Sequence, residues 1–208
     1  MKKFINGVEN ILTESLTGFG KANSDIIKIH LSPDFIYRAK ENKEDKVAVI
    51  SGGGSGHEPL HGGFVGYGML DAACPGQIFS APTPDQMEAA ANRVHSGKGI
   101  LFIIKNYSGD LMNFEMGADM IEFDNATVVV NDDVAVEDST FTTGRRGVAG
   151  TMIVEKVVGS LAETGASLSE CENFGNYVNK MTGSMGVAFT SCTVPAAGKP
   201  TFELSADE

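Results

Sequence analysis

The stretch that decides the fold is residues 51–63, SGGGSGHEPLHGG, which directly follows the apolar run KVAVI at residues 46–50. An apolar run that ends in glycines is typical of a buried strand that leaves a sheet through a tight turn. The same letters resemble three functional motifs: a phosphate-binding glycine loop, a serine nucleophile elbow and the HExxH sequence of zinc proteases. The spacing of the chemically active residues has to decide between them.

The glycines alone do not predict a self-contained nucleotide site. A Walker loop needs GxxxxGK[ST], so that a lysine and a hydroxyl meet phosphate and magnesium, and this string does not occur in the sequence. Neither GGGSGH nor GGFVGYG fits the dinucleotide pattern GxGxxG. The backbone amides of such a turn can still hold an anion or a polarised oxygen.

The two hydrolase motifs each fail at one position. In the elbow pattern GxSxG, His57 stands where the closing glycine is required. His57, Glu58 and His61 match HExxH, but that motif needs both imidazoles on one face of a helix, and Pro59 disfavours helical geometry at the preceding residue. A zinc hydrolase therefore stays only as an alternative.

The composition limits the partners and the compartment. Sixteen basic and twenty-seven acidic residues give a formal net charge of −11, which disfavours nucleic acid and anionic membranes as partners. No apolar run approaches the length of a membrane span, and polar residues interrupt any signal sequence behind the MKK start. The three cysteines are widely spaced without a CxxC pair, so we expect a cytoplasmic, reduced protein.

Short apolar runs alternate with helical patterns along the chain. We expect buried strands at residues 46–51, 100–104, 127–131 and 186–191. Capping boxes in TPDQ at residues 83–86 and SLSE at 167–170 predict helix starts. A third helix is expected over residues 147–163, with apolar contacts from Val148, Met152, Ile153, Val157 and Leu161. This alternation predicts an α/β fold: one mostly parallel, mixed sheet with helices on both faces.

Polar residues leave the ends of three of these strands, where α/β proteins bind their ligands. His57 follows the first strand, Lys105 and Asp110 follow the second in KNYSGD, and Asp132 and Asp133 follow the third. A histidine beside an aspartate can take a proton from a hydroxyl, and a lysine can hold a carbonyl or phosphoryl oxygen. The alternatives are an Asp110 that merely caps a helix, a Lys105 on the surface, and two solvated rim aspartates.

Several long motifs, in one order, make the chain similar to a known family. They are SGGGSGHEPLHGGFVGYGML, ACPGQIFSAPTPDQ, IIKNYSGDLMNFE, DDVAVEDS with TGRRGVAGT, and CTVPAAGKP. Over essentially all 208 residues the chain resembles the dihydroxyacetone-binding subunits of dihydroxyacetone kinases, the DhaK family, in their N-terminal portion. The resemblance implies an α/β fold, a homodimer and dihydroxyacetone held at the rim of the sheet. It places ADP or ATP with Mg on a separate all-helical DhaL-type subunit or domain, so this chain carries no cofactor or metal of its own.

The resemblance also implies a site. Six positions match the family's substrate-binding residues: Gly54, Ser55, Gly56, His57, Lys105 and Asp110. Among these, His57 matches the catalytic base, and Asp110 matches the residue that assists activation of the substrate. The family holds its substrate as a hemiaminal on a histidine in an IHGEPG-like stretch, and none of His30, His61 or His95 lies in such a context. We therefore expect residues 1–208 to be one DhaK-type domain that stops before the family's C-terminal part.

Two functions follow as hypotheses. The first is phosphoryl transfer to a terminal hydroxyl of dihydroxyacetone, giving glycerone phosphate, with the donor reached either directly as ATP or through the phosphoenolpyruvate-dependent phosphotransferase system. The alternative is a kinase-like module that senses dihydroxyacetone and acts as a transcriptional coactivator. An intact His57 favours the enzyme, because a sensor needs no proton acceptor.

Overall fold

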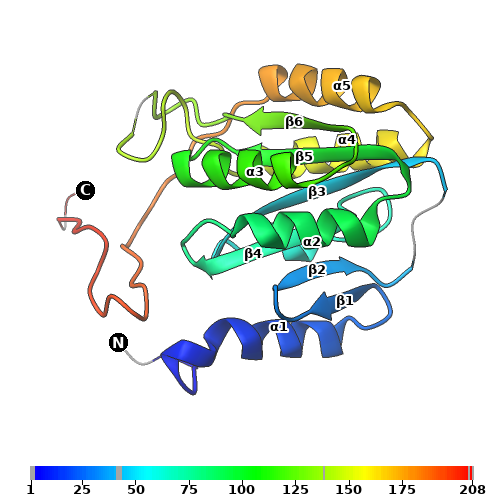
Figure 1. The fold of residues 1–208 in the computed structure, drawn as a ribbon. Helices are drawn as coiled ribbons and strands as arrows, with labels where there is room; N and C mark the ends of the chain where they lie inside the picture. Colours follow the sequence, from blue (N-terminus) through cyan, green and yellow to red (C-terminus); the bar gives the residue numbers. More distant parts are fainter. Residues whose placement is uncertain (1–2, 41–43, 138, 206, 208) are drawn as a thin grey trace.

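The computed structural model describes residues 3–40, 44–137, 139–205 and 207, which form one six-stranded sheet covered by helices on both faces (Figure 1). The strands are β1 (Ile27–His30), β2 (Phe35–Arg38), β3 (Lys46–Ser55), β4 (Ala72–Ile78), β5 (Gly97–Lys105) and β6 (Asn125–Val130). The helices are α1 (Ile11–Ala22), α2 (Pro84–Val94), α3 (Ser108–Met120), α4 (Thr151–Glu163) and α5 (Leu168–Met181), with short 3-10 turns η1 (Val8–Asn10) and η2 (Gly62–Phe64).

The strand order β1-β2-β4-β3-β5-β6 places β3 near the centre of the sheet. Strands β4, β3, β5 and β6 pair in parallel, whereas β2 pairs antiparallel with both β1 and β4. The predicted mixed, mostly parallel sheet is therefore confirmed. Every residue of β3 is buried, because both faces of a central parallel strand are covered by helices.

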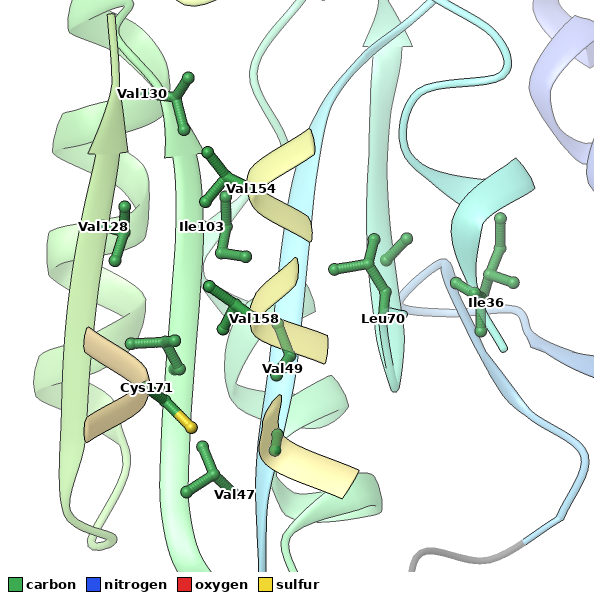
Figure 2. Close-up of a cluster of buried hydrophobic side chains, with 14 of the residues drawn as sticks. Ile36, Val47, Val49, Leu70, Ile103, Val128, Val130, Val154, Val158 and Cys171 are labelled. Atoms are coloured by element: carbon green, nitrogen blue, oxygen red, sulfur yellow. The ribbon is translucent and has the colours of Figure 1, made fainter. Parts of the chain in front are cut away.

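Two apolar cores lie on opposite faces of the sheet. On one face, Val154 and Val158 of α4 point toward Val49 and Ile103, and Cys171 of α5 completes the layer (Figure 2). The other face packs against α2 and α3 (Figure 1), and its core includes the side chains of Met87, Phe102 and Phe114. Helix α1 covers the β1–β2 edge, where Leu12 and Leu16 join the first core.

A buried ion network ties the start of β3 to the loop before β4. The Asp71 carboxylate, fully buried, accepts hydrogen bonds from Lys46 Nζ at 2.6 and 2.7 Å, from Arg38 Nη1 at 2.8 Å and from the Val49 amide at 2.8 Å. Glu163 at the end of α4 binds the same arginine at 2.6 Å. The network thus links two strands of the sheet, β2 and β3, to helix α4.

Most predicted boundaries hold where local chemistry sets them. Gln86 Oε1 accepts from the Thr83 amide at 2.8 Å, and the Ser167 amide donates to Glu170 at 2.8 Å, so both capping boxes are confirmed. The predicted strands at residues 46–51 and 100–104 lie within β3 and β5, and the one at 127–131 overlaps β6, which ends one residue earlier at Val130. Helix α4 ends at Glu163 as expected but begins at Thr151 instead of residue 147.

The strand predicted at residues 186–191 is wrong. This segment lies outside every strand of the described sheet, and Val187 and Phe189 are 71% and 90% exposed. Residues 201–204 (TFEL) form bends and coil, and residues 206 and 208 lie outside the described part. Among the described helices, none is long and apolar enough to cross a membrane.

Replacing Asp71 by Asn tests the network. Lys46, which is 2% exposed, would lose its main counter-charge, and removing one partner of a buried pair costs about 3–5 kcal/mol. We expect the free energy of unfolding, measured in urea, to fall by about that amount. The matched control, Asp119→Asn on the exposed surface of α3, should change it by less than about 0.5 kcal/mol. Equal effects of the two variants would contradict a stabilising role for the network.

Candidate functional site

The site is built on the glycine-rich end of β3, where close contacts exclude side chains. A Cβ on Gly52 would lie 2.5 Å from the carbonyl oxygen of Cys74, and one on Gly54 would lie 2.7 Å from Phe79 Cα and Ser80 N. Gly56 has φ +104° and faces the Phe79 ring, so both its backbone and its surroundings require glycine. Ser55 holds this end in place by donating its hydroxyl hydrogen to the Gly76 carbonyl at 2.6 Å.

His57 is oriented by the turn that carries it. Its Nδ1 lies 2.7 Å from the Gly54 carbonyl, which can only accept, so Nδ1 carries the proton and Nε2 holds the free lone pair. The ring packs edge-on against Phe79 at 4.9 Å between centroids. Burial and the charge of Lys105 lower the pKa of His57, so the imidazole is neutral near pH 7 and can accept a proton.

Lys105 and Asp110 both lie in the interior, at the end of β5 and in the first turn of α3. They are 3% and 6% exposed, so the alternative of a solvated surface lysine is wrong. The residue that caps α3 is Tyr107, so the interpretation of Asp110 as the N-cap is wrong as well. Burial lowers the pKa of Lys105 and raises that of Asp110, and the attraction between their charges opposes both shifts.

Lys105 brings the predicted residues into one neighbourhood. Its charge acts on both His57 and Asp110, and its Nζ would lie 3.2 Å from a Cβ on Gly53. His57, Lys105 and Asp110 therefore lie around the end of β3. Asn106 closes the rim by donating to the carbonyls of Thr143 and Arg145, at 2.9 and 2.7 Å.

The rim aspartates have a structural role instead of the solvated one that we expected. Asp132, 1% exposed, accepts hydrogen bonds from the amides of Val148 and Gly150 at 2.8 and 2.7 Å. Asp133, 0% exposed, forms an ion pair with Arg146 at 2.6 Å. Both side chains hold the loop that leads into α4.

A cavity of about 540 Å³ lies beside the glycine turn. Residues 53–56 and His61 line it together with apolar side chains of α1, including Leu12, Leu16 and Phe19. His57, Lys105 and Asp110 do not line this cavity. His57, Lys105 and Asp110 form a charged corner, which adjoins the cavity at Gly53 and His61.

The two hydrolase interpretations find no support in this geometry. Residues 57–61 form turns instead of a helix, so His57 and His61 do not face one metal ion from adjacent helical turns. Within the described ranges, no group of three His, Cys, Asp or Glu side chains is placed to hold a metal. The Ser55 hydroxyl is buried and bonded to a carbonyl, which leaves it unsuited to act as a nucleophile.

Three buried polar residues beside the site were missed at the level of sequence: Ser51, His61 and Glu155. His61 Nδ1 lies 2.5 Å from Glu155 Oε1 and 3.0 Å from Ser51 Oγ. We had considered His61 only as a zinc ligand. Glu155 gave a usable signal, because it is a carboxylate among the buried positions of α4, together with Thr151, Val154 and Val158.

Comparison with known proteins places the chain in a family. Residues 17–208 match the family model described as the Dak1 domain. The chain belongs to the Dak1 family. It is 49% identical over 211 residues to the dihydroxyacetone-binding subunit DhaK of the PEP-dependent dihydroxyacetone kinase of Escherichia coli, a match that covers 100% of this chain and 59% of that protein. The chain thus spans less than two thirds of this Dak1 relative's length.

Two solved structures resemble this Dak1 chain closely. The dihydroxyacetone kinase of C. freundii in complex with AMP-PNP and Mg²⁺ superposes with a TM-score of 0.86 at 35% identity, over 99% of this chain and 38% of that one. The dihydroxyacetone kinase operon co-activator DhaQ superposes with a TM-score of 0.84 at 35% identity, over 93% of this chain and 60% of that one. The same Dak1 fold therefore occurs in an enzyme and in a regulator.

Replacing Lys105 by Met tests whether Lys105 and His57 share one site. The Lys105 charge lowers the pKa of His57, so its removal should raise that pKa, which can be followed by NMR titration of the imidazole. Lys21→Met, on the exposed surface of α1, makes the same charge change far from the turn and should leave the titration in place. An unchanged His57 titration in the Lys105 variant would show that the two residues do not interact.

Proposed function

We propose that this chain is the substrate-binding part of a dihydroxyacetone kinase and transfers a phosphoryl group to a terminal hydroxyl of dihydroxyacetone, giving glycerone phosphate. The observation that carries the proposal is the state of His57: a neutral imidazole whose Nδ1 proton is engaged by the Gly54 carbonyl and whose Nε2 is free to accept a proton. The Escherichia coli relative, named as a dihydroxyacetone-binding subunit, supports the choice of substrate.

Each member of the site has one role in this proposal. His57 Nε2 takes the proton of the terminal hydroxyl, and the oxygen then attacks phosphorus and displaces the nucleotide. Asp110 orients the hydroxyl or shares its proton, while Lys105 and the turn of Gly54, Ser55 and Gly56 hold the remaining oxygens of the triose. Phosphoryl transfer depends mainly on positioning and charge neutralisation, for which a buried ammonium is suited.

The phosphoryl donor belongs to a partner in this proposal. We place ADP or ATP with Mg on a DhaL-type subunit or domain that docks over the rim of the sheet, and we assign no cofactor or metal to this chain. The C. freundii kinase complex with AMP-PNP and Mg²⁺ supports a nucleotide as part of the assembled enzyme. The PEP-dependent relative favours the phosphotransferase-system route over free ATP. A homodimer and a cytoplasmic location complete the proposal, both by analogy with the family.

A second candidate function is a dihydroxyacetone-sensing coactivator, favoured by the similarity to DhaQ. A sensor and a kinase both need to bind dihydroxyacetone, but only the kinase needs a proton acceptor. Mixing the full-length protein with its nucleotide-bearing partner, a phosphoryl donor and dihydroxyacetone separates the two. Formation of glycerone phosphate supports the kinase, whereas binding of dihydroxyacetone without any turnover supports the coactivator.

Substitution of the two catalytic residues provides the quantitative test. In the full-length protein, His57→Ala should lower kcat by about 10²–10⁴-fold, the usual contribution of a general base, and Asp110→Asn should also lower it strongly. Circular dichroism should show that both variants keep the fold. His30→Gln, a change at an exposed histidine, should leave kcat unchanged. Turnover within about tenfold of the wild-type rate in either site variant would remove the role assigned to that residue.

A further inference from the structure

His61, the second histidine of HEPLH, is a buried group that the proposed mechanism does not use. It is 5% exposed and lies immediately before η2, in contact with Ser51 of β3 and Glu155 of α4. Glu155 is 0% exposed and lies on the buried face of α4, two helical turns before Glu163. Burying a carboxylate and an imidazole costs free energy unless hydrogen bonds or opposite charges offset it. The partners of this pair therefore indicate its role.

The hydrogen bonds fix the tautomer of His61. Ser51 Oγ donates its hydrogen to the Ile103 carbonyl at 2.6 Å, so toward His61 this oxygen can only accept. The Glu155 carboxylate, 2.5 Å from the same nitrogen, also accepts. Nδ1 therefore carries a proton shared between the two oxygens. In the neutral form of the ring, the lone pair is on Nε2.

Two atoms of this pair have no hydrogen-bond partner in the described structure: His61 Nε2 and Glu155 Oε2. Both are buried, and a buried polar atom without a partner costs free energy that a folded protein normally avoids. Among the described residues, they are the only buried side-chain nitrogen or oxygen atoms without a hydrogen-bond partner. Such a pair indicates an interaction that forms in another state of the site, above all when substrate is bound.

The unpaired nitrogen faces the proposed site. A Cβ placed on Gly53 would lie 3.4 Å from His61 Nε2 and 3.2 Å from Lys105 Nζ, so the two nitrogens approach the same point above the glycine. Within the described residues, no hydrogen bond to Lys105 Nζ is formed. The imidazole acceptor and the ammonium donor are thus separated only by the space that Gly53 leaves open.

We propose that His61, held by Glu155 and Ser51, is a positioning residue that accepts a hydrogen bond from the Lys105 ammonium and keeps it above Gly53, where it meets the oxygens of the substrate. The proposal rests on the proposed kinase function for the identity of the substrate, but the interaction itself does not. Glu155 acts through His61, since its carboxylate keeps the proton on Nδ1 and leaves Nε2 as the acceptor.

The charges around Lys105 give the expected pH dependence. Asp110 faces it from α3 and Glu155 from α4, and both carboxylates raise the pKa of Lys105 against the lowering effect of burial. His57 and His61 face it from the glycine turn, and the Tyr107 ring lies 5.8 Å from Nζ. Replacing Glu155 by Gln removes one of the two negative charges, so Lys105 should lose its proton at lower pH.

The first measurement is the titration of Lys105 in the full-length protein labelled with ¹³Cε-lysine, with the signal assigned by its loss in Lys105→Met. We expect Glu155→Gln to move the Lys105 midpoint to lower pH. Glu115→Gln, which removes one exposed carboxylate from α3, should leave the midpoint in place. An unchanged midpoint in Glu155→Gln would overturn the proposal.

The second measurement uses two amides that imitate the two ring nitrogens of His61. Asn places its amide near Nδ1 and leaves the Nε2 position empty, whereas Gln reaches the Nε2 position with a polar group. His61→Asn should raise the KM for dihydroxyacetone by about 10–100-fold, the effect of one hydrogen bond to a charged group, and His61→Gln should recover most of that loss. Equal losses in both variants would indicate packing alone and would overturn the proposal.

The two measurements also separate this proposal from the proposed function. A wild-type protein that transfers no phosphoryl group to dihydroxyacetone would refute the kinase function, while the Lys105 titration would still decide the role of Glu155. If Glu155→Gln fails to fold, the titration is made on the two His61 variants. His61→Asn should then alter the Lys105 midpoint and His61→Gln should restore it, and identical midpoints in all three proteins would overturn the proposal.

Discussion

The absence of side chains at the end of β3 is the constraint on which the site depends. Gly52 and Gly54 allow the strand to lie against Cys74 and Phe79, and Gly53 leaves the space in which Lys105 and His61 approach one another. Because these glycines continue β3 as a fully buried strand, the turn that follows starts from a rigid position. His57 then owes its orientation to the carbonyl of Gly54 within the same turn.

Clusters of buried charged side chains lie at both ends of β3. At its start, Lys46 and Asp71 form a fully hydrogen-bonded network that includes Arg38 and Glu163, which suits a permanent structural link. At its end, Lys105 lies between carboxylates without a hydrogen bond among the described residues, and two buried atoms next to it lack partners. The satisfied network stabilises the fold, whereas the unsatisfied one is where we propose that the ligand binds.

The sequence predicts the elements whose signals are local. Capping boxes define the starts of α2 and α5, and apolar runs define β3, β5 and β6, because these depend on neighbouring residues only. The segment at residues 186–191 has the same apolar pattern but remains outside the sheet, since pairing depends on a partner strand that the pattern does not specify. Strands β1, β2 and β4 and helix α1 gave no signal strong enough to be predicted.

The residues of the site likewise fall into those that the sequence predicts and those that it does not. The position of His57, Lys105 and Asp110 at strand ends follows from the rule that parallel strands present their carboxyl ends at one rim, and the structure places all three around β3. The Ser51–His61–Glu155 group could not be deduced, because it joins residues 94 positions apart through a helix face that we assigned to other side chains. Met152 and Ile153, expected to be apolar contacts of that helix, are instead exposed.

A crystal structure of the full-length protein with dihydroxyacetone bound tests the central claim most directly. We expect the triose at the charged corner, with one terminal hydroxyl within hydrogen-bonding distance of His57 Nε2 and the Asp110 carboxylate, and another oxygen on Lys105 Nζ. A triose bound in the apolar cavity against α1, with His57 and Asp110 pointing away from it, would contradict the claim.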